Sequence, residues 1–143
     1  MQNSNGLWTC IVPVDIDSDG DEDFLLGNLA PNTQFNASLQ QPMRLCVNDF
    51  LHTGKTESVL CYYIKGTSYP YASRNEMLDE MPLLKKKFLY YKDYAVAKLN
   101  DIFTADQMQG MTELKANELK NCWLENTGNG KLVLHELPIA AQF

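Results

Sequence analysis

A nine-residue acidic segment near the N-terminus, residues 15–23, constrains the fold of this chain more than any other feature. It holds five aspartates and one glutamate and reads DIDSDGDED. Carboxylates this close together repel one another, and Ser, Asp and Gly favour turns over helices and strands. Gly20 permits a tight reversal, because glycine adopts positive φ without steric cost. We therefore expect an exposed loop that is stabilised by a bound cation.

The spacing of the carboxylates in this loop indicates calcium. Calcium takes six to eight oxygen ligands at about 2.3–2.6 Å, and a short loop folded around the ion can supply them. Side chains at loop positions one, three and five point inward together, a backbone carbonyl near position seven can add an oxygen, and a carboxylate at position nine can close the site. The expected metal-binding residues are Asp15, Asp17, Asp19, Asp21 and Asp23. The alternative is a solvated acidic turn that binds no metal.

An EF-hand does not fit this segment. That motif requires a bidentate glutamate at position twelve and a helix on each side of the loop. Position twelve is Leu26, and the flanking residues 7–14 and 24–26 are apolar or β-branched, as strands are. The loop is therefore expected to join two strands.

Further strands and a set of helices are predicted from the pattern along the rest of the chain. Residues 43–47 and 58–64 are apolar runs bounded by turn residues, which indicates strands. A capping-box pattern begins at Ser73, and Pro82 ends or restarts the helix that follows it. Apolar residues at helical spacing predict a helix over residues 92–103. A second capping-box pattern, Thr104 with Gln107, predicts another helix over residues 104 to about 120.

The C-terminal residues return to β character. Two strand candidates, 121–125 and 131–136, flank an Asn-Gly pair at 129–130, which is a strong hairpin signal. The expected fold class is α+β, with antiparallel strands and a helical insertion. We expect one domain over residues 1–143, with β repeats in 1–68, the helical insertion in 69–120 and the hairpin in 121–143.

The D-x-D-x-D-G-x-x-D spacing of residues 15–23, placed between strands, resembles the calcium loop of FG-GAP repeats. These repeats, also called VCBS repeats, form the propeller blades of integrin α-chains and of many bacterial surface proteins. Residues 23–35 resemble the strand and loop that follow the calcium loop. Parts of residues 69–88 are similar to the helical insertion of a Bacteroidetes-type subgroup, and residues 123–132 are similar to the hairpin of the family.

A second copy of the loop is degenerate. Residues 48–57 place Asp49 at position one and Glu57 at position nine. Positions three and five are Leu51 and Thr53, and leucine has no oxygen with which to bind a metal. We expect no tight calcium site in this second loop.

The resemblance implies a propeller-blade arrangement with a structural ion. A propeller needs at least four blades of four strands, whereas we expect six or seven strands here, fewer than two blades. The chain would then be a fragment of a longer repeat protein, associate with copies of itself, or use its helices to cover a sheet. The resemblance also implies an extracellular or cell-envelope setting, although no signal peptide is visible at the N-terminus.

The resemblance implies a calcium-stabilised binding or scaffold module, including adhesion, while composition and motifs disfavour an enzyme. The net charge of −6 disfavours nucleic acid as a partner, and no apolar run reaches the roughly 20 residues needed to span a bilayer. Known catalytic and cofactor-binding motifs are not found, so we assign no catalytic or cofactor-binding residue. The expected partner is a protein or a carbohydrate, and unpaired strand edges leave room for a homo-oligomer. The alternatives are a metal-free interaction or oligomerisation module descended from such repeats, and an enzyme.

The four cysteines form no zinc-binding motif. None belongs to a CxxC pair, and each lies in an apolar run. Buried free thiols are expected on that ground, while a disulfide stays open for an oxidising compartment. The residues are Cys10, Cys46, Cys61 and Cys122.

Overall fold

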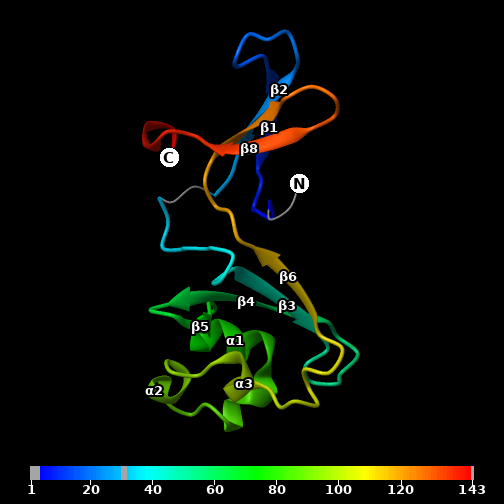
Figure 1. The fold of residues 1–143 in the computed structure, drawn as a ribbon. Helices are drawn as coiled ribbons and strands as arrows, with labels where there is room; N and C mark the ends of the chain where they lie inside the picture. The colour runs from blue at the N-terminus through cyan, green and yellow to red at the C-terminus, as the bar shows by residue number, and fades with distance from the viewer. Residues whose placement is uncertain (1–3, 30–31, 143) are drawn as a thin grey trace. The chain divides into compact units, whose positions relative to one another are not determined.

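The computed structural model describes residues 4–29 and 32–142, and it confirms the α+β class. The described residues form eight strands in two four-stranded sheets, together with short helices (Figure 1). The chain divides into two compact units. The terminal unit comprises Met1–Pro42 and Ala116–Phe143, and the inserted unit is Met43–Lys115. The expected boundary between residues 68 and 69 therefore falls inside the inserted unit. The reason is that the strands Met43–Asn48 and Glu57–Ile64 belong to the same unit as the helices.

The terminal unit is built on two hairpins. Its sheet contains, in spatial order, β1 (Cys10–Val14), β2 (Asp23–Gly27), β7 (Cys122–Asn126) and β8 (Leu132–Glu136). The central pair, β2 and β7, places Phe24 opposite Leu124. The predicted C-terminal hairpin is confirmed, and Gly128, Asn129 and Gly130 turn the chain with φ values of 76°, 54° and 73°. A 3-10 segment, η2 (Ile139–Ala141), follows β8.

The inserted unit packs helices against a second sheet. The sheet order is β5 (Thr67–Pro70), β4 (Glu57–Ile64), β3 (Met43–Asn48) and β6 (Thr112–Ala116). The helical segments are α1 (Arg74–Glu80), η1 (Pro82–Lys86), α2 (Tyr91–Tyr94) and α3 (Leu99–Ile102). Cys46, Val59 and Cys61 line the covered face of the sheet, and they share one buried apolar cluster with residues of the helices. Within this cluster the rings of Phe50 and Phe103 stack with their centroids 4.2 Å apart.

The hairpins β1–β2 and β3–β4 repeat one another. Val14 lies opposite Asp23, and Asn48 lies opposite Glu57, so the second hairpin corresponds to the first with an offset of 34 residues, from 14 to 48 and from 23 to 57. The same offset relates all five residue pairs of β1 and β2 to pairs of β3 and β4. The internal copy inferred from the sequence is therefore present as a structural repeat.

The predictions of two helices, over residues 92–103 and 104–120, are wrong. The helix expected over residues 92–103 is split into α2 and α3, because Lys98 is extended and its N–H donates to the Asp101 carboxylate, which starts a new helix. The helix expected over residues 104–120 does not form. Thr104 and Gln107 exchange the predicted capping bonds, but Gly110 has a φ of 76°, and the chain continues as β6.

The cysteines are free thiols in both units. Cys46, Cys61 and Cys122 are buried as expected, whereas Cys10 is exposed on the edge strand β1, which corrects the expectation for that residue. Burial raises the pKa of Cys122 to about 11. That thiol therefore stays protonated at neutral pH and behaves as an apolar core residue.

The stacked phenylalanines yield a first prediction. Phe103→Ala should lower the free energy of unfolding of the inserted unit by about 3–5 kcal/mol, because it removes a ring that is only 1% exposed and leaves a cavity. All seven tyrosines lie in this unit, so urea unfolding can be followed by tyrosine fluorescence. Leu89→Ala removes a side chain that is 67% exposed, and it should change stability by less than about 0.5 kcal/mol. Equal losses for the two variants would contradict this description of the core.

Candidate metal centre

The acidic loop, residues 15–23, joins β1 to β2 through two residues of positive φ. Ser18 has a φ of 63° and Gly20 a φ of 91°. No atom lies within 4 Å of the position that a Cβ would occupy at Gly20, so backbone conformation alone favours glycine there. The expected exposed loop between two strands is confirmed.

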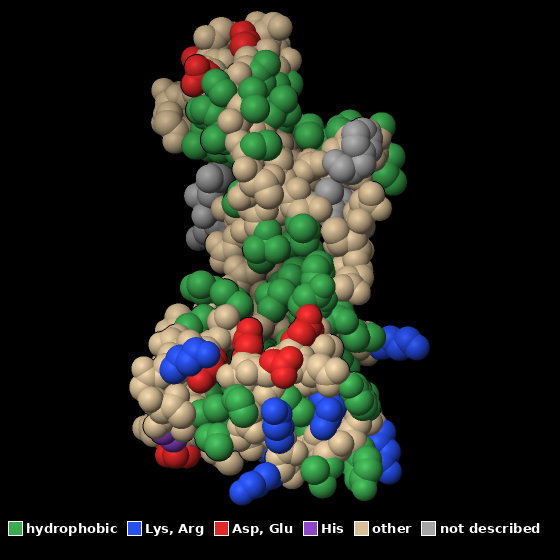
Figure 2. Space-filling model, turned by 180° about the vertical axis from the view of Figure 1, so that it is seen from behind, with side chains coloured by type: hydrophobic (Ala, Val, Ile, Leu, Met, Phe, Trp, Pro, Cys, Tyr) green, Lys and Arg blue, Asp and Glu red, His purple; other side chains and the backbone are tan. Residues whose placement is uncertain are grey.

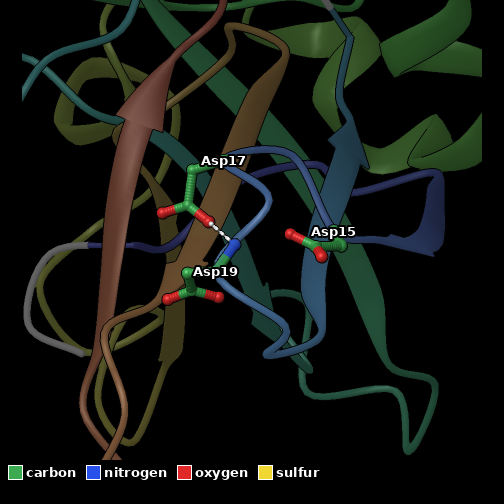
Figure 3. Close-up of side chains that lie close together, drawn as sticks. All are labelled: Asp15, Asp17 and Asp19. Carbon is green, nitrogen blue, oxygen red and sulfur yellow. Dashed lines mark hydrogen bonds between the residues drawn. The ribbon is translucent and has the colours of Figure 1, made fainter.

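Three carboxylates meet in this loop. One oxygen from each of Asp15, Asp17 and Asp19 lies within 4.8 Å of the other two. Figure 3 shows Asp17 and Asp19 one above the other on the loop, with Asp15 across from them at the end of β1. Two oxygens bound to one calcium at about 2.3–2.6 Å are at most about 5 Å apart. The spacing of the three side chains is therefore already compatible with one shared ion.

Backbone N–H groups hold these carboxylates in place. The N–H of Asp19 donates to Asp17 Oδ1 at 3.2 Å, and the N–H of Asp21 donates to Asp19 Oδ1 at 2.8 Å. Gly20 donates in the same way to Asp15 Oδ2 at 3.3 Å. Each of the three side chains thus has one oxygen tied to the loop, which fixes its direction.

The electrostatic environment of the loop is strongly negative. The terminal unit contains two lysines and no arginine against nine aspartates and glutamates. Partial desolvation raises the pKa of Asp17 above its ordinary value of 3.8, and the charges of Asp19, Asp23 and Glu125 add to the rise, while the bond from the Asp19 N–H opposes it. Within the described part of the chain, no lysine or arginine forms an ion pair with the three carboxylates. A bound cation would therefore reduce the repulsion among the three aspartate carboxylates.

The structure does not bring Asp21 and Asp23 into this cluster. Asp21 is exposed, and its carboxylate lies toward the β7–β8 turn, near Gly128. Asp23 is fully buried, and its two oxygens accept the N–H groups of Ile16 at 3.0 Å and Asn126 at 2.8 Å. These two bonds join the loop to the end of β7, so the position-nine carboxylate acts here as a structural link.

Sequence reasoning missed the contributions of β7 to this site. The N–H of Asn126 and the charge of Glu125 reach the loop from about 100 residues away along the chain. The only available signal was the predicted C-terminal hairpin, which does not reveal its neighbour in the sheet.

The second loop, residues 49–57, has the same conformation with different chemistry. His52 and Gly54 have φ values of 52° and 81°, which match Ser18 and Gly20 of the acidic loop. The Asp49 carboxylate accepts the N–H of Thr53 at 2.8 Å and that of Gly54 at 2.6 Å. These bonds and the nearby imidazole lower the pKa of Asp49. Both carboxylate oxygens of the single aspartate in this loop thus accept hydrogen bonds from the loop backbone.

The fold and the site together define an α+β protein with a repeated hairpin and a candidate centre for a hard divalent cation. No family model, curated protein or solved structure matches the chain. None of the described helices is long and apolar enough to cross a membrane.

The buried carboxylate of Asp23 gives a second prediction. Asp23→Ala should lower the free energy of unfolding by about 2–4 kcal/mol, because it leaves the N–H groups of Ile16 and Asn126 without an acceptor. Urea unfolding followed by tryptophan fluorescence measures this loss, since Trp8 and Trp123 both lie in the terminal unit.

Asp23→Asn is the matched control for that variant. It keeps one acceptor oxygen and the volume of the side chain, so its loss should be intermediate. Asp21→Ala, in the same loop, should have little effect on stability. A loss for Asp21→Ala as large as that for Asp23→Ala would contradict the structural role given to Asp23.

Proposed function

We propose that this chain is a calcium-binding repeat module in which one ion, held by the acidic loop, stabilises the β1–β2 hairpin. The observation that carries the proposal is the approach of three aspartate oxygens to within 4.8 Å of one another. Oxygen ligands on an exposed and adaptable loop suit calcium, which accepts irregular geometry and completes its coordination with water. We assign ion binding to Asp15, Asp17 and Asp19.

The role proposed for the ion is structural, and the role proposed for the module is binding or scaffolding, adhesion included. An ion that binds only the folded loop adds its binding free energy to the stability of the fold. The resemblance to FG-GAP repeats supports this reading, because the loop joins two strands and a second hairpin repeats it. An extracellular or cell-envelope setting is consistent with such a loop, since extracellular calcium modules bind at about 10⁻⁴–10⁻³ M. We propose no enzymatic activity.

The second candidate is a metal-free interaction module derived from such repeats. The second loop favours it, because hydrogen bonds to Asp49 hold the same conformation with no carboxylate at position three or five. In this view the first loop would also hold its shape through its own hydrogen bonds. The two candidates differ in whether calcium stabilises the terminal unit.

Calcium addition gives the third prediction. Calcium at about 100 times its Kd should raise the Tm of chelator-treated protein by roughly 5–10 °C. Asp17→Asn should abolish the rise, because it removes one of the three approaching carboxylates. Tryptophan fluorescence during heating reports the terminal unit in both proteins.

Glu22→Gln is the matched control for Asp17→Asn. It removes one negative charge from the same loop, but Glu22 lies outside the cluster of three carboxylates. The control should retain the calcium-dependent rise in Tm. Absence of any rise at millimolar calcium in the unchanged protein would exclude the calcium site and favour the metal-free module.

The raised pKa of Asp17 predicts how the calcium effect depends on pH. The pKa of Asp17 is higher in the folded chain than its ordinary value of 3.8, so protonated Asp17 stabilises the fold. This stabilisation is lost as the pH rises through the pKa of the folded chain. Above that pH, the ionised carboxylate is unfavourable unless a cation is bound. The calcium-dependent rise in Tm should therefore be largest near neutral pH and shrink as the pH falls toward the raised pKa of Asp17, because protons compete with the ion. A series of melts with and without calcium measures this. A rise that does not change with pH would contradict the assignment of Asp17 as a ligand.

A further inference from the structure

The inserted unit contains a cleft that the proposed calcium loop does not involve. Its volume is about 600 Å³, which is within the range of sites for small ligands. The walls come from β4, β5, the start of α1 and α2, which are neighbours in this unit (Figure 1). Four tyrosines and two basic residues stand out among the lining side chains. They are Tyr62, Tyr69, Tyr91, Tyr94, Arg74 and Lys92.

The tyrosines present ring surfaces to the cleft. Tyr62 and Tyr69 lie opposite each other on β4 and β5, and both are half-buried. The hydroxyl of Tyr94 donates to the carbonyl of Ala72 at 2.8 Å, and that of Tyr91 donates to Asn75 Oδ1 at 2.7 Å. Since these two hydroxyls are already bonded within the protein, the rings are the parts left to contact a ligand.

The charge of the cleft is positive. Arg74 and Lys92 line it, and no acidic side chain does so among the described residues. The Arg74 guanidinium lies 4.9 Å from the centre of the Tyr91 ring and donates to the carbonyls of Phe88 and Leu89 and to Asn75. These bonds use three of its five N–H groups, so two remain for a ligand. Among the described residues, the partners of this guanidinium are neutral acceptors and one aromatic ring, and it forms no ion pair.

This combination selects for a ligand that has an apolar face and a carboxylate. A pyranose ring offers such a face through its C–H groups, which pack on aromatic rings, while a uronic or sialic acid adds a carboxylate that arginine and lysine bind. We propose that the cleft binds the acidic sugar of a short oligosaccharide, with Tyr91 as a stacking platform and with Arg74 and Lys92 at the carboxylate. Figure 2 shows basic, acidic and apolar side chains interspersed on one face of the inserted unit.

Other ligands fit the cleft less well. A nucleotide would need backbone N–H donors for its phosphates in addition to the two basic side chains, but the first turn of α1 is already capped, because Ser73 and Glu76 exchange hydrogen bonds. A peptide added as a strand needs N–H groups along the free edge of β5, and Pro70 has none. An acidic peptide bound through its side chains is the remaining competitor, and it is included in the test.

The inference deepens the proposed binding role, but it does not depend on calcium. All the lining residues belong to the inserted unit, whereas the acidic loop belongs to the terminal unit. Binding measured in chelator and in calcium therefore separates the two proposals. Binding that persists in chelator, in a protein whose Tm calcium does not raise, would contradict the calcium proposal and support the cleft.

The test uses the full chain and pairs of glycans that differ in one acidic sugar. An array of such pairs, including 3′-sialyllactose beside lactose and glucuronyl-terminated beside glucosyl-terminated disaccharides, should show binding only to the acidic members. Titration calorimetry with the best acidic glycan then gives its Kd. Pentaglutamate, titrated in parallel, represents an acidic peptide.

Two substitutions connect binding to the cleft. Tyr91→Ala should weaken the Kd about tenfold, whereas Tyr91→Phe should retain binding, because it keeps the ring. Leu83→Ala is the control: Leu83 is 67% exposed and does not line the cleft. Lys92→Gln should weaken binding of the acidic glycan and reduce its dependence on salt.

Several outcomes would overturn the inference. Equal binding of acidic and neutral glycans would exclude the role of the carboxylate. Binding of pentaglutamate alone would identify an acidic peptide as the ligand. No binding to any member of the array, or equal effects of Leu83→Ala and Tyr91→Ala, would exclude this cleft as a glycan site.

Discussion

The repeated hairpins depend on one interaction, a hydrogen bond from a backbone N–H near the start of each loop to a buried carboxylate at its end. Ile16 donates to Asp23 at 3.0 Å, and Phe50 donates to Glu57 at 3.1 Å. Both carboxylates are buried, so the charge-assisted bond is strong, and leaving the N–H unpaired would be costly. This bond closes a seven-residue span and fixes the register of the strands on either side. The residues between the N–H donor and the carboxylate can therefore differ in sequence while the hairpin stays the same.

The two loops show what that freedom permits. Position three is Asp17 in the first loop, where it faces solvent with two other carboxylates. In the second loop the same position is Leu51, which packs against the buried cluster of the inserted unit. A potential metal ligand in one copy thus corresponds to a hydrophobic contact in the other. The burial of the equivalent strands β1 and β3 also differs, since Val12 is 49% exposed and its equivalent Cys46 is 0% exposed.

Local patterns in the sequence predicted the parts of the fold that local interactions decide. The acidic loop, the capping box at Ser73 and the Asn-Gly hairpin were recognisable because each depends on residues only a few positions apart. The sequence could not reveal that β2 pairs with β7, because that contact spans the whole inserted unit. The helix expected over residues 104–120 failed for a related reason. The positive φ of Gly110 ends the helical conformation, and the following residues form β6, which is hydrogen-bonded to β3 at the edge of the sheet.

Charge is distributed unequally between the units, and this bears on what each can bind. Ten of the twelve basic residues lie in the inserted unit, which has nine acidic ones, so its net charge is +1 against −7 for the terminal unit. The chain's overall charge of −6 therefore combines one strongly acidic unit with another that is nearly neutral. Desolvation of the Asp17 carboxylate and repulsion within the first loop raise the pKa of that side chain. In the tyrosine cleft, by contrast, Arg74 and Lys92 form no ion pair with any described residue. Because the net charge of the inserted unit is close to zero, the proposed binding of an acidic ligand depends on the local charges of Arg74 and Lys92.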